Sequence, residues 1–491
     1  MDFDGSSAIL IAMGTHRAIL PDAPPAPTNI EGGRHMDPKR IALLLILAPI
    51  LWGCSDSDSM SPPDDPSPPG ASTPPDDSKT DDLPEAYRLI MTDKLIDADY
   101  WQEEPAILAA GLGFTDINGI PGLGESGQTL EEMEQLVREY GGGWHDVLSE
   151  ADDIAQRART SSNSVFGMTQ TFGYASPSGD GLPMELSHPI LASTVQREDI
   201  LIRLNTGDTV VPTNISVMPN MEFNERSTLV MNGDFGNRLD TDHPEAIFPV
   251  MFEIVDEMLM MTPNGAFDAK GLAYGDGATP LTAYRSGHGP RLCAAKLTRA
   301  DVGLEGEGAP TTFQDSSFPN DAISLYGEEA DFRIRVLTTG GFSPDGVRSL
   351  YPTEYRRFFR VGVQPEGVAA DDYDALLWLT ETNTPYTLEG IGSLEVLGLA
   401  ELGVKLDEYD DSYIEDHDNQ IDIVLKGDQA MAARVVVVHI PAAGDYMPFY
   451  NPGGPGDRPD SETRYSEPGP SYFQPVTIAI DDPMVVSYTP E

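Results

Sequence analysis

Phe-Arg-Ile-Arg-Val, residues 332–336, alternates apolar and cationic side chains. Successive side chains of a β-strand point to opposite faces, so this alternation predicts a strand with one apolar face. The same period of two recurs at residues 200–204 and 476–480, and residues 435–438 form a fully apolar run. Gly, Pro, Asn and Asp separate these runs. Short strands with such turn residues predict a mainly β protein with one or two antiparallel β-sandwich domains.

A small helical segment is expected before the strands, over residues 86–160. Thr129 and Glu132 have the spacing of a capping box, in which each side chain bonds the other residue's backbone N–H. Apolar residues then recur at helical spacing until the glycines at 141–143. A second amphipathic helix is expected from about residue 144 to residue 159.

The β-rich part is long enough for two domains. A turn cluster, Gln-Pro-Glu-Gly at residues 364–367, follows a predicted strand. Because domain boundaries fall in exposed segments rich in Pro and Gly, we expect a boundary there. The pattern therefore predicts a first β-sandwich at residues 165–365 and a second β-rich domain at residues 366–491.

The N-terminal part has a different pattern. Lys39 and Arg40 precede an apolar run from Ile41 to Leu51. A charged start, a short apolar stretch and a small residue before the cleavage point are typical of a secretory signal peptide. The sequence Leu-Trp-Gly-Cys at residues 51–54 resembles the lipobox of bacterial lipoproteins, although Trp52 is bulkier than the residue usual at that place.

This resemblance implies that residues 36–53 are a signal peptide. It also implies that Cys54 becomes the first residue, carries lipid such as palmitate and serves as the membrane anchor. Ser55 favours the outer membrane or the cell surface, with the periplasmic face as the other option. Residues 1–35 do not fit a signal peptide and are expected to come from an upstream start or to be disordered.

Residues 54–85 are expected to form a spacer. They are rich in Pro, Asp and Ser, and they lack apolar periodicity. Such a segment cannot bury a core and stays extended. At about 3.1 Å per residue its full reach is on the order of 90 Å. We therefore expect the spacer to hold the folded part away from the membrane.

Charge and cysteine content exclude some functions. The formal net charge is -50, which repels nucleic acid and anionic lipid, so no nucleic-acid partner is expected. The two cysteines are Cys54 and Cys293. With Cys54 lipidated, no intrachain disulfide can form.

The densest group of oxygen ligands lies at residues 407–422. Calcium takes six to eight oxygen ligands, which alternating carboxylates on a loop can supply. The run departs from an EF-hand, because Ile421 stands where that loop needs Gly and Gly427 stands where it needs Glu. The alternative is a solvated acidic loop. The candidate calcium ligands are Asp410, Asp411, Asp416, Asp418, Gln420 and Asp422.

Aromatic residues gather in the Pro- and Gly-rich segment at residues 441–475. Exposed aromatic side chains are common in binding surfaces, and packing within the loop is the alternative. The candidates for contact with an unknown extracellular or envelope ligand are Tyr446, Phe449, Tyr450 and Tyr472.

No catalytic motif is evident, so the sequence leaves open whether the protein is an enzyme. His-Glu-x-x-His is absent, and Gly-Phe-Ser-Pro-Asp at residues 341–345 lacks the last glycine of a nucleophile elbow. We expect a lipid-anchored acidic cell-envelope protein with a binding, adhesive or structural role, supported by calcium. The alternative is an exported hydrolase of polysaccharide, ester or phosphate that uses carboxylates or a metal.

Overall fold

The computed structural model describes residues 85–490. It leaves out residues 112, 143–144, 147–157, 160–161, 174–175, 218–219, 221, 283–290, 303–305, 307–319, 340–349, 403, 406–412, 415–418 and 442–471. The predicted signal peptide, lipidation site and spacer therefore lie outside the described residues. Across these ranges, no helix has both the length and the apolar character needed to cross a membrane.

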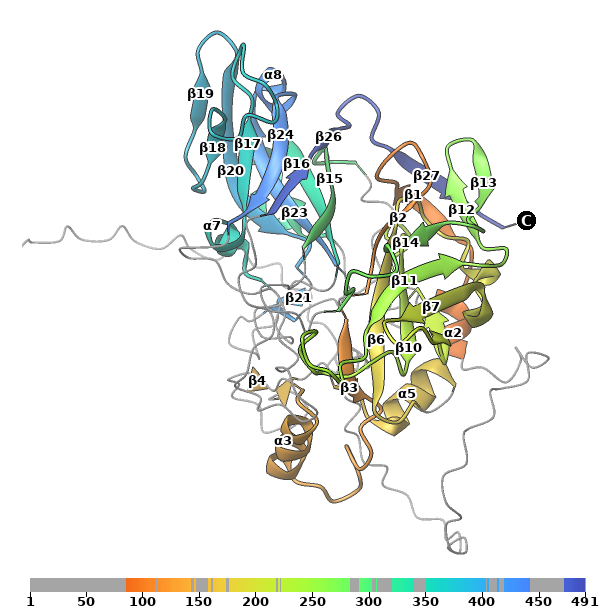
Figure 1. Cartoon of the computed structure of the whole chain (residues 1–491). Coiled ribbons are helices and arrows are strands. Elements are labelled where there is room, and N and C mark those ends of the chain that lie inside the picture. Colours follow the sequence, from red (N-terminus) through yellow and green to blue (C-terminus); the bar gives the residue numbers. More distant parts are fainter. Residues whose placement is uncertain are drawn as a thin grey trace, which may run out of the picture. The chain divides into compact units, whose positions relative to one another are not determined.

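The described chain is mainly β, and its first sandwich joins a five-stranded to a four-stranded antiparallel sheet (Figure 1). In the five-stranded sheet the order is β2-β6-β10-β9, and β3 also pairs with β6. The other sheet has the order β14-β11-β7-β8. The bounds are β2 Ile107–Ala110, β3 Phe114–Asn118, β6 Gly179–Leu186, β7 Ile200–Leu204, β8 Thr209–Val210, β9 Asn214–Ser216, β10 Thr228–Gly233, β11 Pro249–Ile254 and β14 Ala273–Tyr274.

The core of this sandwich lies between its two sheets. Met184 and Met231 from the five-stranded sheet belong to one buried cluster with Ile202 and Phe252 from the four-stranded sheet. A hairpin of β12 (Leu259–Thr262) and β13 (Gly265–Asp268) is added to this part of the chain. The alternation at residues 200–204 appears as β7, whose residues Ile200, Ile202 and Leu204 are buried, which confirms the predicted strand.

The second sandwich joins a six-stranded sheet, β19-β20-β23-β16-β15-β26, to a four-stranded sheet, β18-β17-β24-β25. All pairs are antiparallel except β15 with β26, which are parallel. The bounds are β15 Leu292–Arg299, β16 Phe332–Thr338, β17 Arg360–Val363, β18 Leu377–Leu379, β19 Tyr386–Leu388, β20 Gly392–Ala400, β23 Gln420–Gly427, β24 Val435–Ile440, β25 Tyr472–Pro475 and β26 Thr477–Ile478. Ile334 and Ile423 share its core with Val361 and Val438.

The first and last strands of the described chain pair with each other. β1 (Leu95–Asp99) is antiparallel to β27 (Val485–Tyr488), with Ala98 opposite Val486. The chain after residue 472 thus contributes β25, β26 and β27 to three different sheets. This C-terminal segment therefore connects the second sandwich, through β25 and β26, with β1 at the beginning of the described chain, through β27.

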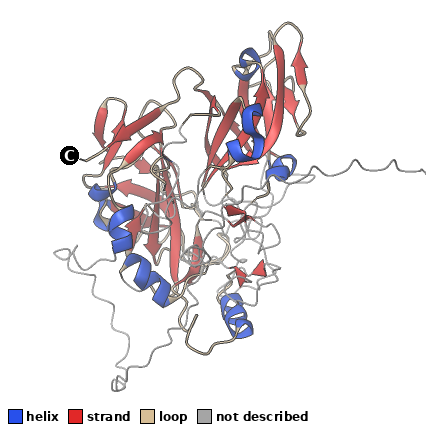
Figure 2. Ribbon diagram, turned by 180° about the vertical axis from the view of Figure 1, so that it is seen from behind, coloured by secondary structure: helices blue, strands red, loops and turns tan. Residues whose placement is uncertain are grey.

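In the part of the chain that the structure describes, helices are few and short (Figure 2). The predicted capping box is confirmed at α3, where Thr129 Oγ1 accepts from the Glu132 backbone N–H at 3.2 Å. The Glu132 carboxylate in turn accepts from the Thr129 backbone N–H at 2.8 Å. The helices are α2 Glu85–Ile90, α3 Leu130–Glu139, α5 Val165–Phe172, α6 Ala322–Tyr326, α7 Tyr355–Phe358 and α8 Gln429–Ala432.

The structure differs from the sequence patterns at two places. Residues 86–160, where we expected helices, also hold β1, β2 and β3, because these strands pair with distant β27 and β6. Two short strands, β4 (His145–Asp146) and β5 (Ala158–Arg159), pair at the ends of the predicted second helix, and the residues between them lie outside the described ranges.

The second difference concerns the boundary expected at residue 365. It falls between β17 and β18, which pair in one sheet. The second core draws residues from Leu292 to Ile480, so strands on both sides of residue 365 share it. The turn signals at 364–367 therefore mark a connection within a sandwich. A further two-stranded sheet consists of β21 (Val404–Lys405) and β22 (Tyr413–Ile414).

A buried charge cluster as the candidate functional site

Three charged residues form a row across the six-stranded sheet. Lys296 on β15 lies opposite Arg335 on β16, and Arg335 lies opposite Asp422 on β23. Like charges placed opposite each other across strands repel, so Lys296 and Arg335 need nearby anions. These side chains are on the face of the sheet that points away from the apolar core, and yet all three are buried.

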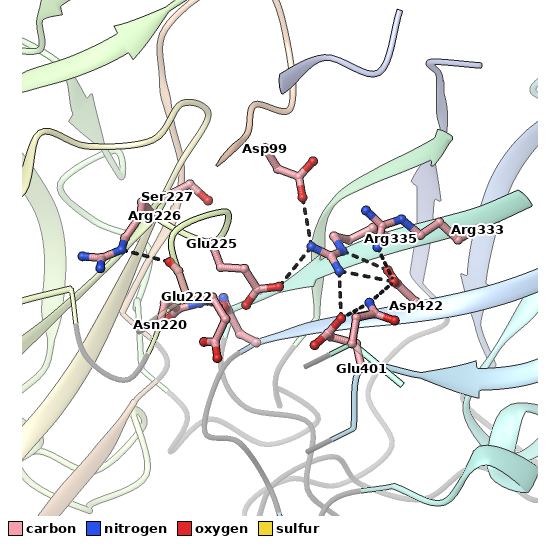
Figure 3. A network of polar contacts seen from close by, with 12 residues as sticks. Asp99, Asn220, Glu222, Glu225, Arg226, Ser227, Arg333, Arg335, Glu401 and Asp422 are labelled. Carbon is pink, nitrogen blue, oxygen red and sulfur yellow. Dashed lines mark hydrogen bonds and ion pairs between the residues drawn. The ribbon is translucent and has the colours of Figure 1, made fainter. Parts of the chain in front are cut away.

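Arg335 is the centre of the cluster (Figure 3). Its guanidinium contacts four carboxylates, at 3.1 Å for Asp99, 3.1 Å for Glu225, 2.9 Å for Glu401 and 2.9 Å for Asp422. A guanidinium offers five N–H donors in a planar fork, which suits several carboxylates at once. The side chain is 1% exposed, so these contacts form away from water and are weakly screened.

Asp99 joins the two neighbouring cations. One carboxylate oxygen lies 2.5 Å from Lys296 Nζ, and the other lies 3.1 Å from the Arg335 guanidinium. Lys296 Nζ also donates to the backbone carbonyl of Met484 at 2.8 Å and to that of Tyr100 at 3.4 Å. The three acceptors match the three protons of an ammonium group, whereas burial lowers the pKa of Lys296 from its ordinary value.

Asp422 is the second bridging carboxylate. It accepts from Arg333 at 2.8 Å and from the side-chain amide of Asn320 at 2.8 Å, in addition to Arg335. Asn320 also donates to Glu401, which has a φ of 58°. A positive φ is uncommon for a residue with a side chain and persists where the surroundings hold it.

The electrostatics of the two bridging carboxylates are governed by their partners. Burial opposes ionisation of Asp422, but Arg333 and Arg335 hold the pKa of its carboxyl well below the ordinary value. Burial likewise opposes ionisation of Asp99, and Lys296 and Arg335 outweigh it, so that the pKa of Asp99 is lowered. Both carboxylates are therefore ionised at neutral pH, and the cluster consists of paired charges.

The cluster is a set of buried ion pairs that connects separate segments of the chain. Asp99 belongs to β1 and Glu225 precedes β10, whereas Lys296, Arg335 and Asp422 belong to the six-stranded sheet. Breaking a buried pair leaves an uncompensated charge and is strongly destabilising. The cluster therefore holds the first sandwich region and β1 against the second sandwich.

Ser187 and His188 have a spacing that suggests a nucleophile and its base. Ser187 Oγ lies 2.9 Å from His188 Nδ1. However, both residues are fully buried, and Ser187 Oγ accepts the backbone N–H of Ala106 at 2.8 Å. The His188 ring stacks on Tyr100 with 5.3 Å between ring centroids, and burial lowers the pKa of His188 to about 4. The pair has a packing role in this structure.

Most residues proposed from the sequence lie outside the described ranges. These are Cys54, Asp410, Asp411, Asp416, Asp418, Tyr446, Phe449 and Tyr450. Gln420 and Asp422 lie two residues apart on β23, where the Asp422 carboxylate is held by arginines. Tyr472 on β25 is half-buried and packs against the core of the second sandwich. Among the described residues, no group of three or more His, Cys, Asp or Glu side chains is arranged to hold a metal ion.

Sequence reasoning missed Asp99, Glu225, Lys296 and Glu401. The one available signal was the pair of arginines that alternates with the apolar residues of β16. Nothing in a single sequence links Arg335 to the carboxylate of Asp99, which lies 236 positions away. Only the packing of β1 against the six-stranded sheet brings them together.

Comparisons of this chain with protein-family models, with curated proteins and with solved structures find no match. Its function is therefore inferred from its own residues.

Proposed function

We propose that this chain is a lipid-anchored acidic protein of the cell envelope with a binding, adhesive or structural role. The observation that carries the proposal is the lipobox-like sequence Leu-Trp-Gly-Cys at residues 51–54, which follows a basic pair and a short apolar run. The charges of the buried cluster around Arg335 are engaged in joining distant strands, which favours a structural role for these residues.

The N-terminal pattern supports the location. The lipobox-like residues 51–54 are followed by a spacer rich in Pro and Asp, and the formal net charge of the chain is -50. A tether of that composition stays extended and holds the folded part away from the membrane. We place the protein at the outer membrane or the cell surface, with an envelope or extracellular ligand as its partner and calcium as its candidate ion.

Lipid attachment tests the location. In cells fed a palmitate analogue, the wild-type protein should carry the label and sediment with membranes. Cys54→Ser should lose the label and appear in the soluble fraction. Cys293→Ser is the matched control and should behave as wild type, because Cys293 lies on β15 within the folded part. A labelled, membrane-bound Cys54→Ser protein would contradict the anchor.

Substrate screening tests the role. The purified protein should show no turnover of glycans, esters or phosphates, and deletion of its gene should weaken adhesion or envelope integrity. Turnover that survives purification to homogeneity would instead establish the hydrolase alternative.

A further inference from the structure

A second polar contact between the sandwiches lies apart from the charge cluster. Glu185 on β6 and Thr228 on β10 are cross-strand neighbours, and both are buried. Thr228 Oγ1 lies 2.5 Å from Glu185 Oε2. The other oxygen of this carboxyl group, Oε1, is buried and has no hydrogen-bond partner. In the described part of the chain Glu185 forms no ion pair with a cation.

Asn419 reaches this pair from the second sandwich. Its side-chain oxygen lies 3.3 Å from Thr228 Oγ1 and accepts from the amide of Asn220 at 3.1 Å. Its amide nitrogen donates to the backbone carbonyl of Thr338 on β16 at 2.6 Å. The chain of polar contacts therefore runs from β6 through Thr228 and Asn419 to β16.

The number of available protons determines which of these polar contacts can be hydrogen bonds. The Thr228 hydroxyl has one proton, whereas two oxygens lie within reach of Oγ1. If Glu185 is ionised, the hydroxyl proton goes to Oε2, and the contact with the Asn419 oxygen has no proton. If Glu185 is a carboxylic acid, its proton goes to Thr228 Oγ1 and the hydroxyl proton goes to Asn419.

The Oε1 atom of Glu185, which is buried and has no hydrogen-bond partner, favours the carboxylic acid over the ionised carboxylate. An ionised carboxylate would leave a charged oxygen buried without a donor, which costs far more than leaving a neutral carbonyl oxygen there. We propose that Glu185 is a neutral carboxylic acid in the native protein and that its proton completes a latch from Glu185 through Thr228 to Asn419 between the two sandwiches. Loss of this proton breaks the Thr228–Asn419 bond and loosens the junction.

The surroundings agree with a neutral acid. Burial raises the pKa of Glu185 to about 8, although the polar side chains of Thr228 and Asn419 beside it oppose the shift. On β15, the Cys293 thiol is the titratable neighbour, and burial raises its pKa well above the ordinary value. On the segment before Thr228, Glu225 is paired with Arg335, and the Arg226 guanidinium donates to the backbone carbonyl of Glu222.

The sign of the pH dependence follows from linkage. A carboxyl group whose pKa is raised in the native state keeps its proton after the unfolded chain has lost it. Its contribution to stability is therefore full below the unfolded value of about 4.3 and is lost as pH rises toward about 8. The latch weakens on the alkaline side.

Trp101 is a reporter at this junction. Its indole N–H donates to Ser227 Oγ at 3.1 Å, and its ring packs with Ala294 and Leu337 of the second sandwich. Tryptophan fluorescence of the full-length protein should change reversibly with a midpoint near pH 8. Glu185→Gln, which keeps the shape but cannot ionise, should remove this transition and should melt several degrees above wild type on the alkaline side.

Two variants test which residue titrates and which residue reports the fluorescence transition. Cys293→Ala should retain the transition, and Trp101→Phe should lose the fluorescence change while its melting temperature keeps the same pH dependence. Infrared difference spectra of the wild-type protein across the transition should show loss of a protonated carboxyl band, which does not depend on any variant folding. A transition that persists in Glu185→Gln, disappears in Cys293→Ala, or lacks the carboxyl band would overturn the proposal.

Discussion

The carboxylate of Asp99 accepts a hydrogen bond from the guanidinium of Arg335 at 3.1 Å, although 236 positions separate the two residues. Asp99 ends β1, and the partner of β1 is β27 at the end of the described chain. The Asp99–Arg335 contact thus connects β1 to the centre of the six-stranded sheet, and the pairing of β1 with β27 brings the last described strand to the same place.

Arg335→Met should destabilise the protein strongly. The substitution leaves the carboxylates of Asp99, Glu225, Glu401 and Asp422 without their shared cation in a buried site. Removing one partner of a buried ion pair costs about 3–5 kcal/mol of unfolding free energy. Urea denaturation at neutral pH measures the loss.

Lys270→Met is the control for that loss. Lys270 forms a 3.0 Å ion pair with Asp256, but both side chains are more than half exposed. Exposed pairs contribute little, so its denaturation midpoint should match wild type. If Arg335→Met were as stable as this control, the inference that the buried ion pairs around Arg335 stabilise the fold would be wrong.

Truncation after Ile480 should lower the melting temperature. It removes β27, the partner of β1, and it removes the Met484 carbonyl that accepts from Lys296 at 2.8 Å. Truncation after Tyr488 leaves β27 complete and is the matched control. The two proteins should differ by several degrees in a calorimetric scan. Equal melting temperatures would show that β27 does not hold β1 in place.

His188 should make the protein sensitive to acid. Burial lowers the pKa of His188 to about 4, so the native state resists a proton that the unfolded chain binds near pH 6.5. Stability is therefore lost as pH falls between those values, by on the order of 2–3 kcal/mol. His188→Phe, which can keep the stack on Tyr100, should show a smaller loss in urea denaturation across this range. An unchanged slope would assign the acid sensitivity to other groups.

Calcium should raise the melting temperature if the acidic run at residues 407–422 binds it. Binding to the native state alone adds about 2.7 kcal/mol at a hundredfold excess over Kd. Thermal melts in chelator, then in rising calcium and in rising magnesium, measure the effect. The double variant Asp416→Asn/Asp418→Asn should abolish the calcium response. A flat response in the wild-type protein would identify the run as a solvated acidic loop.

The local elements were predictable because their causes are local. The alternation at residues 200–204 requires only that one face of a strand is buried, and β7 has that face. Thr129 and Glu132 form the capping box because both partners lie within one turn of the helix that they begin.

Strand pairing was less predictable, because a turn signal does not say which strands meet. The Gln-Pro-Glu-Gly turn at residues 364–367 does precede a break in the chain's regular structure. The strands on its two sides, β17 and β18, then pair with each other. Composition marks where the backbone turns, but the sheet to which the next strand belongs depends on contacts far along the chain.

The sequence by itself determined strands such as β7 and β16 and their apolar faces, since the period of side chains along a strand follows from backbone geometry alone. It also determined that Arg333 and Arg335 share the opposite face of that strand. Only the tertiary structure decided that this second face is buried, because Asp99, Glu225 and Glu401 come from separate segments to neutralise it. Burying those cations is favourable only once every counter-charge is in place, and that condition depends on the complete fold.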